Sequence, residues 1–137
     1  MRVVLDTNVL VSGLLKPHGA PGEIVRMASA GALQVCYDSR ILIEYREVML
    51  RPRFGFPENR VEALLDEIKA CGHTVSGGPL KARLPDRDDE PFLEAAIAGE
   101  ADYLITGNIK DYPASAREGI AIVSAAQFLE AYRRLEP

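Results

Sequence analysis

Acidic side chains recur in this chain where the local pattern predicts the end of a strand or the interior of a helix. Asp6 directly follows the apolar run 2–5, and Asp38 follows the strand-like run 33–37. Glu44 lies further on, within a predicted helix and among apolar neighbours. Carboxylate oxygens gathered at one place are the ligands that Mg²⁺ and Mn²⁺ prefer in proteins. Such a cluster supports metal-assisted hydrolysis of a phosphate ester.

The segment 86–90 is the densest acidic run, since four of its five residues are Asp or Glu. It precedes a predicted helix, where one acid would cap the helix and interact favourably with its dipole. Four acids exceed that need and would repel one another unless a cation were present. Asp88 and Asp89 are therefore both candidates for a metal ligand.

Polar side chains also follow the predicted strand 103–106. Asn108 comes two residues after this strand, and Asp111 comes three residues later. An amide oxygen can bind Mg²⁺ but brings no charge, so either Asn108 or Asp111 could complete a metal site. Asp111 could instead cap the turn before Tyr112.

Asp6 and Glu44 also have purely structural interpretations. Asp6 could cap the helix predicted over 9–15, which alone would explain an Asp at this position. Glu44 could form an ion pair with Arg40 or Arg51 on the surface of its helix.

Other catalytic chemistries have little support in the sequence. His18 and His73 are the only histidines, and neither stands in a Ser/His/Asp or Cys/His set. The chain has no Walker-type loop and no GxGxxG fingerprint. Cys36 and Cys71 are far apart in the sequence, so we interpret them as reduced thiols of a cytoplasmic protein.

Charge and hydropathy narrow the class of protein further. The net charge of −4 argues against a protein that holds nucleic acid mainly through a large basic surface. No apolar run approaches the roughly 20 residues that span a bilayer, and the apolar N-terminus is interrupted by Asp6, so we expect no membrane segment and no signal peptide.

The order of predicted elements indicates the fold. Apolar strands alternate with amphipathic helices, which is typical of an α/β protein with a parallel sheet. We expect one domain over 1–137, a three-layer α/β/α sandwich around a mainly parallel sheet of about five strands. The predicted strands are 2–5, 33–37, 73–75, 103–106 and 120–123, and the clearest helices are 9–15, 39–50, 61–72, 91–98 and 125–135. Ligands bind outside the carboxyl ends of such strands, where the acids fall.

Together these segments resemble the PIN-domain nucleases. The matching stretches are 3–12, 39–49, 86–96 and 101–108, in family order and across most of the chain. Within the family, the chain is similar to the VapC-like toxins of bacterial and archaeal toxin–antitoxin systems. The resemblance implies a PIN-like fold and an endoribonuclease that requires Mg²⁺ or Mn²⁺ and cuts RNA to leave a 5′-phosphate and a 3′-hydroxyl. It also implies a cognate antitoxin as protein partner and a possible homodimer.

The resemblance also assigns site residues. Asp6, Glu44 and Asp89 carry over as metal ligands, with Asp88 a near-equal alternative to Asp89. Asn8 and Thr106 are similar to supporting residues that hold the carboxylates by hydrogen bonds. Asn108 stands where many members have an acid, so Asp111 is the candidate for the missing carboxylate.

Two other functions stay open. A PIN-like module could bind RNA or a protein without cutting it. Asn108 supports this alternative, because it stands where many members have an acid and brings no charge to the site. A receiver-type α/β domain with an acidic metal site is the other, but it would need a Lys after a late strand, and none lies near Val123.

Overall fold

The computed structural model describes residues 1–135, and its centre is a parallel sheet of five strands. The order across the sheet is β3-β2-β1-β4-β5, so the first strand of the chain lies in the middle. The predicted fold class is confirmed. The strands are β1 (Arg2–Leu5), β2 (Gln34–Tyr37), β3 (His73–Thr74), β4 (Tyr103–Ile105) and β5 (Ile122–Val123).

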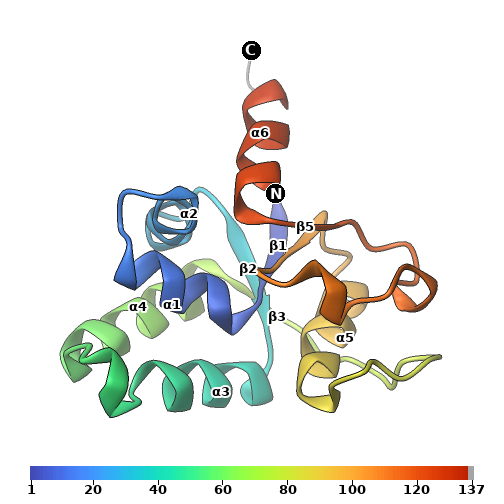
Figure 1. Cartoon of the computed structure of the whole chain (residues 1–137), viewed down its shortest axis with the longest axis horizontal. Coiled ribbons are helices and arrows are strands. Elements are labelled where there is room, and N and C mark those ends of the chain that lie inside the picture. The colour runs from blue at the N-terminus through green and yellow to red at the C-terminus, as the bar shows by residue number, and fades with distance from the viewer. Residues whose placement is uncertain (136–137) are drawn as a thin grey trace.

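Six α-helices pack around this sheet. In Figure 1, α1 to α4 lie to one side of the strands and α5 lies to the other, while α6 extends away from the sheet at the end of the chain. Four short 3-10 helices occur in connections that the sequence predicted as irregular. The α-helices are α1 (Thr7–Leu15), α2 (Ala20–Ser29), α3 (Ser39–Met49), α4 (Glu58–Cys71), α5 (Glu90–Ala98) and α6 (Ala125–Leu135).

The core explains why the first strand is so apolar. Val3, Val4 and Leu5 are all 0% exposed, because β1 is paired on both edges and covered on both faces. Its partners are β2 and β4, with Val3 opposite Tyr103 and Leu5 opposite Ile105. A strand buried in this way fixes the residue that follows it, Asp6, at the middle of the sheet edge.

Close packing of α1 against α2 holds α1 in place. A Cβ on Gly22 would lie 2.1 Å from the Pro17 carbonyl oxygen, and one on Gly13 would lie 2.5 Å from Val25 Cγ2. Only glycine permits this approach at either position. The contact of Gly13 with α2 near the C-terminal end of α1 therefore helps to fix the position of the whole helix, including its first residue after Asp6.

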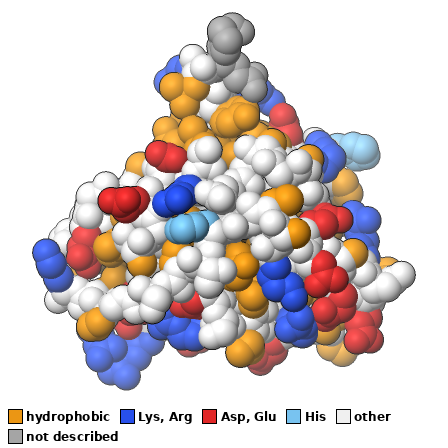
Figure 2. All heavy atoms as spheres, turned by 180° about the vertical axis from the view of Figure 1, so that it is seen from behind, with side chains coloured by type: hydrophobic (Ala, Val, Ile, Leu, Met, Phe, Trp, Pro, Cys, Tyr) orange, Lys and Arg blue, Asp and Glu red, His pale blue; other side chains and the backbone are white. Residues whose placement is uncertain are grey.

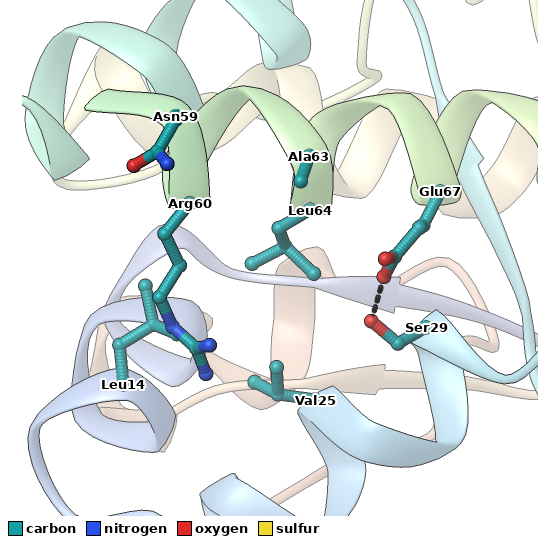
Figure 3. Close-up of a pocket in the computed structure, with 8 residues that line it drawn as sticks. All are labelled: Leu14, Val25, Ser29, Asn59, Arg60, Ala63, Leu64 and Glu67. Atoms are coloured by element: carbon teal, nitrogen blue, oxygen red, sulfur yellow. Dashed lines mark hydrogen bonds between the residues drawn. The ribbon is translucent and has the colours of Figure 1, made fainter. Parts of the chain in front are cut away.

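A cavity of about 270 Å³ lies between α1, α2 and α4. Figure 3 shows Arg60 extending into it from α4 and the hydrogen bond between Ser29 and Glu67 at its other end. It contains none of the predicted metal ligands, so it is separate from the predicted site. Within residues 1–135, no helix has both the length and the apolar character needed to cross a membrane.

Candidate active site

The carboxyl ends of the central strands bring the first site residues together. The backbone N–H of Asp6 donates to the Ile105 carbonyl at 2.9 Å, so the chain at Asp6 still pairs with β4. Thr106, the next residue after β4, therefore lies beside Asp6 although the two are far apart in the sequence. This meeting of strand ends is the one that the parallel topology predicted.

Asp6 is a buried carboxylate, 5% exposed, held by two hydroxyl groups. Thr106 Oγ1 donates to Asp6 Oδ2 at 2.9 Å, and the Tyr112 hydroxyl donates to the same oxygen at 3.0 Å. Burial raises the pKa of Asp6, and these two hydrogen bonds oppose that effect only in part. Asp6 stands at the N-cap position of α1, but its side chain forms no capping hydrogen bond, so capping alone does not explain an Asp at this position.

Glu44 points from α3 toward α1 and is half-buried. Its Oε2 accepts a hydrogen bond from the Thr7 hydroxyl. Burial raises the pKa of Glu44, the Thr7 hydrogen bond lowers it, and the charge of Asp6 raises it again. Among the ion pairs of residues 1–135, Glu44 pairs with neither Arg40 nor Arg51, so the surface ion pair considered for it is not formed.

Asp89 is the most perturbed carboxylate of the group. Its pKa is raised to about 7, mainly by burial and further by the nearby charges of Asp6, Asp111, Asp86 and Glu44. Its Oδ2 is buried and has no hydrogen-bond partner among the described residues. A buried carboxylate oxygen without a donor is costly, and a cation would supply the missing partner.

Asp88 is exposed, whereas Asp89 is half-buried. Asp86 accepts the backbone N–H of Asp88 at 2.9 Å and so caps the short 3-10 helix Arg87–Asp89. With Asp86 engaged in this cap and Asp88 exposed, Asp89 is the aspartate of this segment that has a buried carboxylate oxygen. The geometry therefore favours Asp89 over Asp88 as the candidate ligand.

Asn108 and Asp111 lie together at the rim. Asn108 Nδ2 donates to Asp111 Oδ1 at 3.0 Å, and the Asn108 backbone N–H donates to Thr106 Oγ1 at 3.1 Å. The charge of Asp111 raises the pKa values of both Asp6 and Asp89, so Asp111 belongs to the same electrostatic group.

Asn8 has a different position from the one expected. Its Oδ1 accepts the backbone N–H of Gly107 at 2.8 Å, which ties α1 to the loop after β4. In the described part of the chain its side chain bonds to no carboxylate, so the expected direct support of a metal ligand is absent. Asn8 instead holds in place the loop that carries Asn108.

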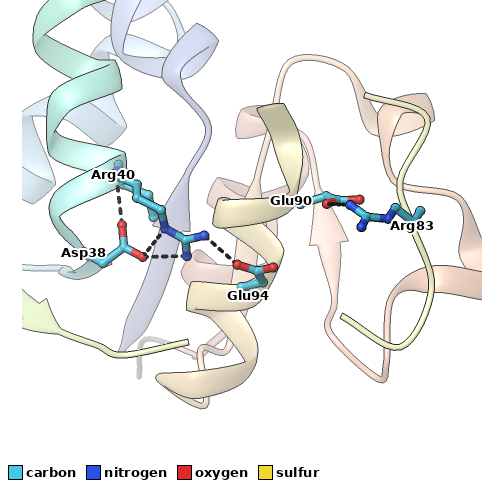
Figure 4. A network of polar contacts seen from close by, with 6 residues as sticks. Asp38, Arg40, Arg83, Glu90 and Glu94 are labelled. Atoms are coloured by element: carbon cyan, nitrogen blue, oxygen red, sulfur yellow. Dashed lines mark hydrogen bonds and ion pairs between the residues drawn. The ribbon is translucent and has the colours of Figure 1, made fainter. Parts of the chain in front are cut away.

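Arg40 connects the helix of Glu44 with the helix that follows Asp89. Its Nη2 lies 2.8 Å from Asp38 Oδ2 and its Nη1 lies 2.8 Å from Glu94 Oε1, as Figure 4 shows. Asp38 Oδ1 also accepts the Ile41 backbone N–H and caps α3. Although Asp38 stands at the same sheet edge, its two carboxylate oxygens are thus bonded to the Ile41 N–H of α3 and to Arg40.

Sequence reasoning missed Thr7 and Tyr112. Both are buried, at 5% and 0% exposed, and both donate to a site carboxylate. Thr7 could have been found, because it follows Asp6 at the start of a helix. The sequence around Tyr112 gave no usable signal, since an aromatic residue before a proline is as typical of a core packing residue as of a hydrogen-bond donor to the site.

The donor set fits a hard divalent cation. It consists of carboxylate oxygens without any thiolate or imidazole, which suits Mg²⁺ or Mn²⁺ and not zinc. The unpartnered oxygen of Asp89 and the mutual increase in pKa both indicate a place where positive charge would be stabilising. However, in residues 1–135 no three Asp, Glu, His or Cys side chains lie close enough to hold a metal ion as they stand.

This last finding corrects the expectation that Asp6, Glu44 and Asp89 would already lie within reach of a shared cation. Like charges repel one another in a partly buried site, and Glu44 is turned onto the Thr7 hydroxyl. The carboxylates converge closely enough to perturb one another's pKa values, but not to coordination distance.

Comparisons with known proteins agree with the fold. Residues 2–110 match the family model described as the PIN domain. The chain is also similar to an uncharacterized protein of Methanocaldococcus jannaschii, with 28% identity over 111 residues that cover 79% of this chain and 71% of that protein. Asp111 and Tyr112 fall just beyond the residues that match the family model. Because that match spans most of the chain and the parallel sheet places the acids at its carboxyl edge, this chain belongs to the PIN-domain family.

Proposed function

We propose that this protein is a metal-dependent ribonuclease that hydrolyses phosphodiester bonds in RNA. The observation that carries the proposal is the buried, unpartnered Oδ2 of Asp89 beside the carboxylates of Asp6 and Glu44. A folded protein keeps such a group where a ligand completes it. Membership of the PIN-domain family, whose members are typically metal-dependent nucleases, supports the same chemistry.

In this proposal Asp6, Glu44 and Asp89 hold Mg²⁺ or Mn²⁺. The ion, when bound, supplies positive charge that stabilises the charge developing on the phosphate oxygens. Thr106 and Tyr112 orient Asp6, and Thr7 orients Glu44, so the ligands do not have to be ordered anew when RNA binds.

A proton acceptor is also present in the group. In the metal-free protein Asp89 has a pKa of about 7, and the positive charge of a bound ion would lower that pKa, so Asp89 would be deprotonated and able to accept a proton in neutral solution. It would take the proton from the water whose oxygen attacks phosphorus. As the new bond forms, the bond from phosphorus to the 3′-oxygen breaks and that oxygen takes a proton from solvent, which leaves a 5′-phosphate and a 3′-hydroxyl.

Cleavage of a labelled single-stranded RNA tests the proposal. Wild-type protein should cut the RNA with Mg²⁺ or Mn²⁺ and should stop in EDTA. Asp6→Asn should lower the rate by about a hundredfold or more, because it removes a ligand charge without removing the hydrogen-bonded side chain. Asp66→Asn on α4 is the matched control, since Asp66 is 71% exposed and lies outside the site. Cleavage that survives EDTA, or equal rates for the two variants, would refute a metal-dependent mechanism in this site.

The alternative is a PIN-like module that binds RNA or protein without cutting. Its support is Asn108, whose amide donates to Asp111 where many family members place another acid. The same assay separates the two functions, because a binding module would retain the RNA intact at every metal concentration.

The finer identification, a toxin of a toxin–antitoxin pair, is supported by the resemblance to VapC-like proteins. Co-expression with the product of the neighbouring open reading frame tests it: a cognate antitoxin should bind this chain and block its nuclease activity.

A homodimer is a further proposal, supported by the apolar side chains of Ile43 and Leu15, which are 59% and 52% exposed. Light scattering should give twice the mass of the chain, and a strict monomer at high concentration would refute it.

A further inference from the structure

The connection between α3 and α4 carries stacked aromatic rings beneath an arginine. The rings of Phe54 and Phe56 have centroids 5.6 Å apart and planes inclined by 13°. The Arg53 guanidinium carbon lies 4.8 Å from the centroid of the Phe54 ring. We call residues 51–57 the Arg-Phe loop.

Backbone geometry organises this loop before any ligand binds. Gly55 has φ of 67°, in the left-handed region, and its N–H donates to the Pro52 carbonyl at 3.1 Å. This turn lets Phe54 and Phe56 stack on each other. Both rings pack partly against the core and stay partly exposed, so the stack is anchored on one side. An anchored, partly open aromatic surface can accept a flat ligand at little cost in conformational entropy.

The arginines of the loop are exposed and available. Arg51 and Arg53 form no ion pair within residues 1–135, whereas Arg46 on α3 pairs with Glu62 on α4 at 2.7 Å. The protein as a whole has a net charge of −4. On the face seen in Figure 2, basic and acidic side chains are interspersed without a continuous basic area. A polyanion such as RNA would therefore bind where positive charge is concentrated locally, and Arg51 and Arg53 supply such charge in this loop.

The loop is also connected with the acidic site. Helix α3 carries Glu44 and ends at Met49, about 7.5 Å further along its axis, and Arg51 follows two residues after that end. An RNA strand held at the carboxylates would need to run only a short way along α3 to reach the loop.

We propose that the Arg-Phe loop binds a single-stranded segment of the RNA substrate, with a base on the Phe54–Phe56 stack and phosphates at Arg51 and Arg53. This inference rests on the proposed ribonuclease function and assigns part of its substrate surface. Stacked aromatic rings beside arginine form the combination that binds single strands without strong sequence preference.

RNA binding by inactive variants tests the proposal. All proteins carry Asp6→Asn, are kept in Mg²⁺, and are titrated against a fluorescein-labelled oligouridylate by fluorescence anisotropy at several salt concentrations. Arg51→Gln with Arg53→Gln should weaken binding and reduce the slope of log affinity against log salt by about 0.7 for each lost phosphate contact. Phe54→Leu with Phe56→Leu should weaken binding about fivefold or more, and should leave the slope unchanged.

Matched controls lie on α6. Arg133→Gln with Arg134→Gln removes the same charge from exposed positions, and Tyr132→Leu removes a partly exposed aromatic ring. Neither control should change RNA affinity as the loop variants do. Circular dichroism checks that each variant is folded, and the exposed arginine pair provides the test even if the Phe variants unfold.

The outcomes separate the two proposals. If the loop variants bind RNA like the α6 controls, with the same salt slope, the loop proposal is overturned even though wild-type protein cuts RNA. If the loop variants keep RNA affinity and lose a protein partner, the loop is a protein-docking surface and the proposal is again overturned. If no version of the protein binds or cuts RNA, the ribonuclease function itself fails.

Discussion

The hydroxyl of Thr7 donates a hydrogen bond to the carboxylate of Glu44, joining the first residue of α1 to the middle of α3. Thr7 directly follows Asp6, so the same short piece of backbone positions one carboxylate and holds another. Asp6 in turn raises the pKa of Glu44 through its charge. The pair is therefore ordered by one hydrogen bond and repelled by like charge, a balance that a bound cation would change in favour of closer approach.

Thr7→Val should show how much this hydrogen bond matters. The substitution keeps the size of the side chain and removes the donor, so the pKa of Glu44 should rise further. We expect a loss of about 1 to 3 kcal/mol in unfolding free energy, as for a partly buried charged group that loses its donor, and roughly tenfold lower RNA cleavage. Denaturant unfolding and single-turnover cleavage measure the two effects. Thr74→Val, at an exposed position, is the control, and equal behaviour of the two variants would contradict the assignment.

Tyr112 and Tyr45 offer a matched comparison between a charged and a neutral acceptor. Both are 0% exposed; Tyr112 donates to Asp6 at 3.0 Å, and Tyr45 donates to the Leu5 carbonyl at 2.6 Å. Either change to Phe should cost about 1 kcal/mol or more in stability. Only Tyr112→Phe should also weaken Mn²⁺ binding, because Asp6 would lose a hydrogen bond that orients its carboxylate and lowers its pKa. Calorimetric titration checks this, and equal Mn²⁺ affinities would show that Tyr112 is a packing residue.

Stability of the metal-free protein should fall as pH rises. Asp89 has a pKa of about 7 in the folded protein against an ordinary 3.8, so between these values the folded state holds more protons than the unfolded state. Unfolding free energy then decreases with pH up to about 7. In EDTA the melting temperature should be higher near pH 5.5 than near pH 8, and Asp89→Asn should flatten this difference.

Added Mg²⁺ should act in the opposite sense. Protons compete with the metal for the same carboxylates, so Mg²⁺ should raise the melting temperature more near pH 8 than near pH 5.5. Asp66→Asn should behave like wild-type protein in both media. A pH profile of Asp89→Asn that superimposes on that of wild-type protein would contradict the assignment of the raised pKa to Asp89.

Asn108 and Asp111 can be separated by a pair of substitutions. Asp111→Ala should lower metal affinity and activity much as Asp6→Ala does, if Asp111 supplies the fourth carboxylate. Asn108→Asp places two acids where an amide now donates to Asp111, so it should destabilise the metal-free protein and tighten Mn²⁺ binding. Wild-type Mn²⁺ affinity and wild-type cleavage by Asp111→Ala would mean that the site works with three carboxylates and that Asp111 belongs to the loop.

Most of the fold could be predicted because its signals are local. The run at 2–5 and the strand before Thr106 are apolar and short, and the helices between them carry apolar residues at helical spacing. Helix and strand ends moved by a few residues at most, as at β5 (Ile122–Val123), predicted to begin at 120. Parallel topology then predicted that Asp6 and the residues after the strand 103–106 lie at one edge of the sheet, whereas the pairing of β1 with β4 came only from the structure.

The site could be predicted only in part, because its details depend on contacts between distant residues. The choice of Asp89 over Asp88 follows from the cap that Asp86 makes, which fixes the orientation of one turn. Tyr112 donates to Asp6 from 106 residues away, and no local pattern distinguishes such a donor from a core aromatic residue. The distances between the carboxylates could not be predicted from the sequence either, since they depend on the balance between like-charge repulsion and the hydrogen bond from Thr7 to Glu44.

The central position of β1 has a consequence for synthesis of the protein. Asp6 is synthesised before its hydroxyl donors, which follow it 100 and 106 residues later. Strand β1 likewise waits for β4 to complete its pairing in the sheet. A nascent chain therefore carries an incomplete site until Tyr112 has emerged, so any activity that needs an ordered Asp6 can begin only after that point.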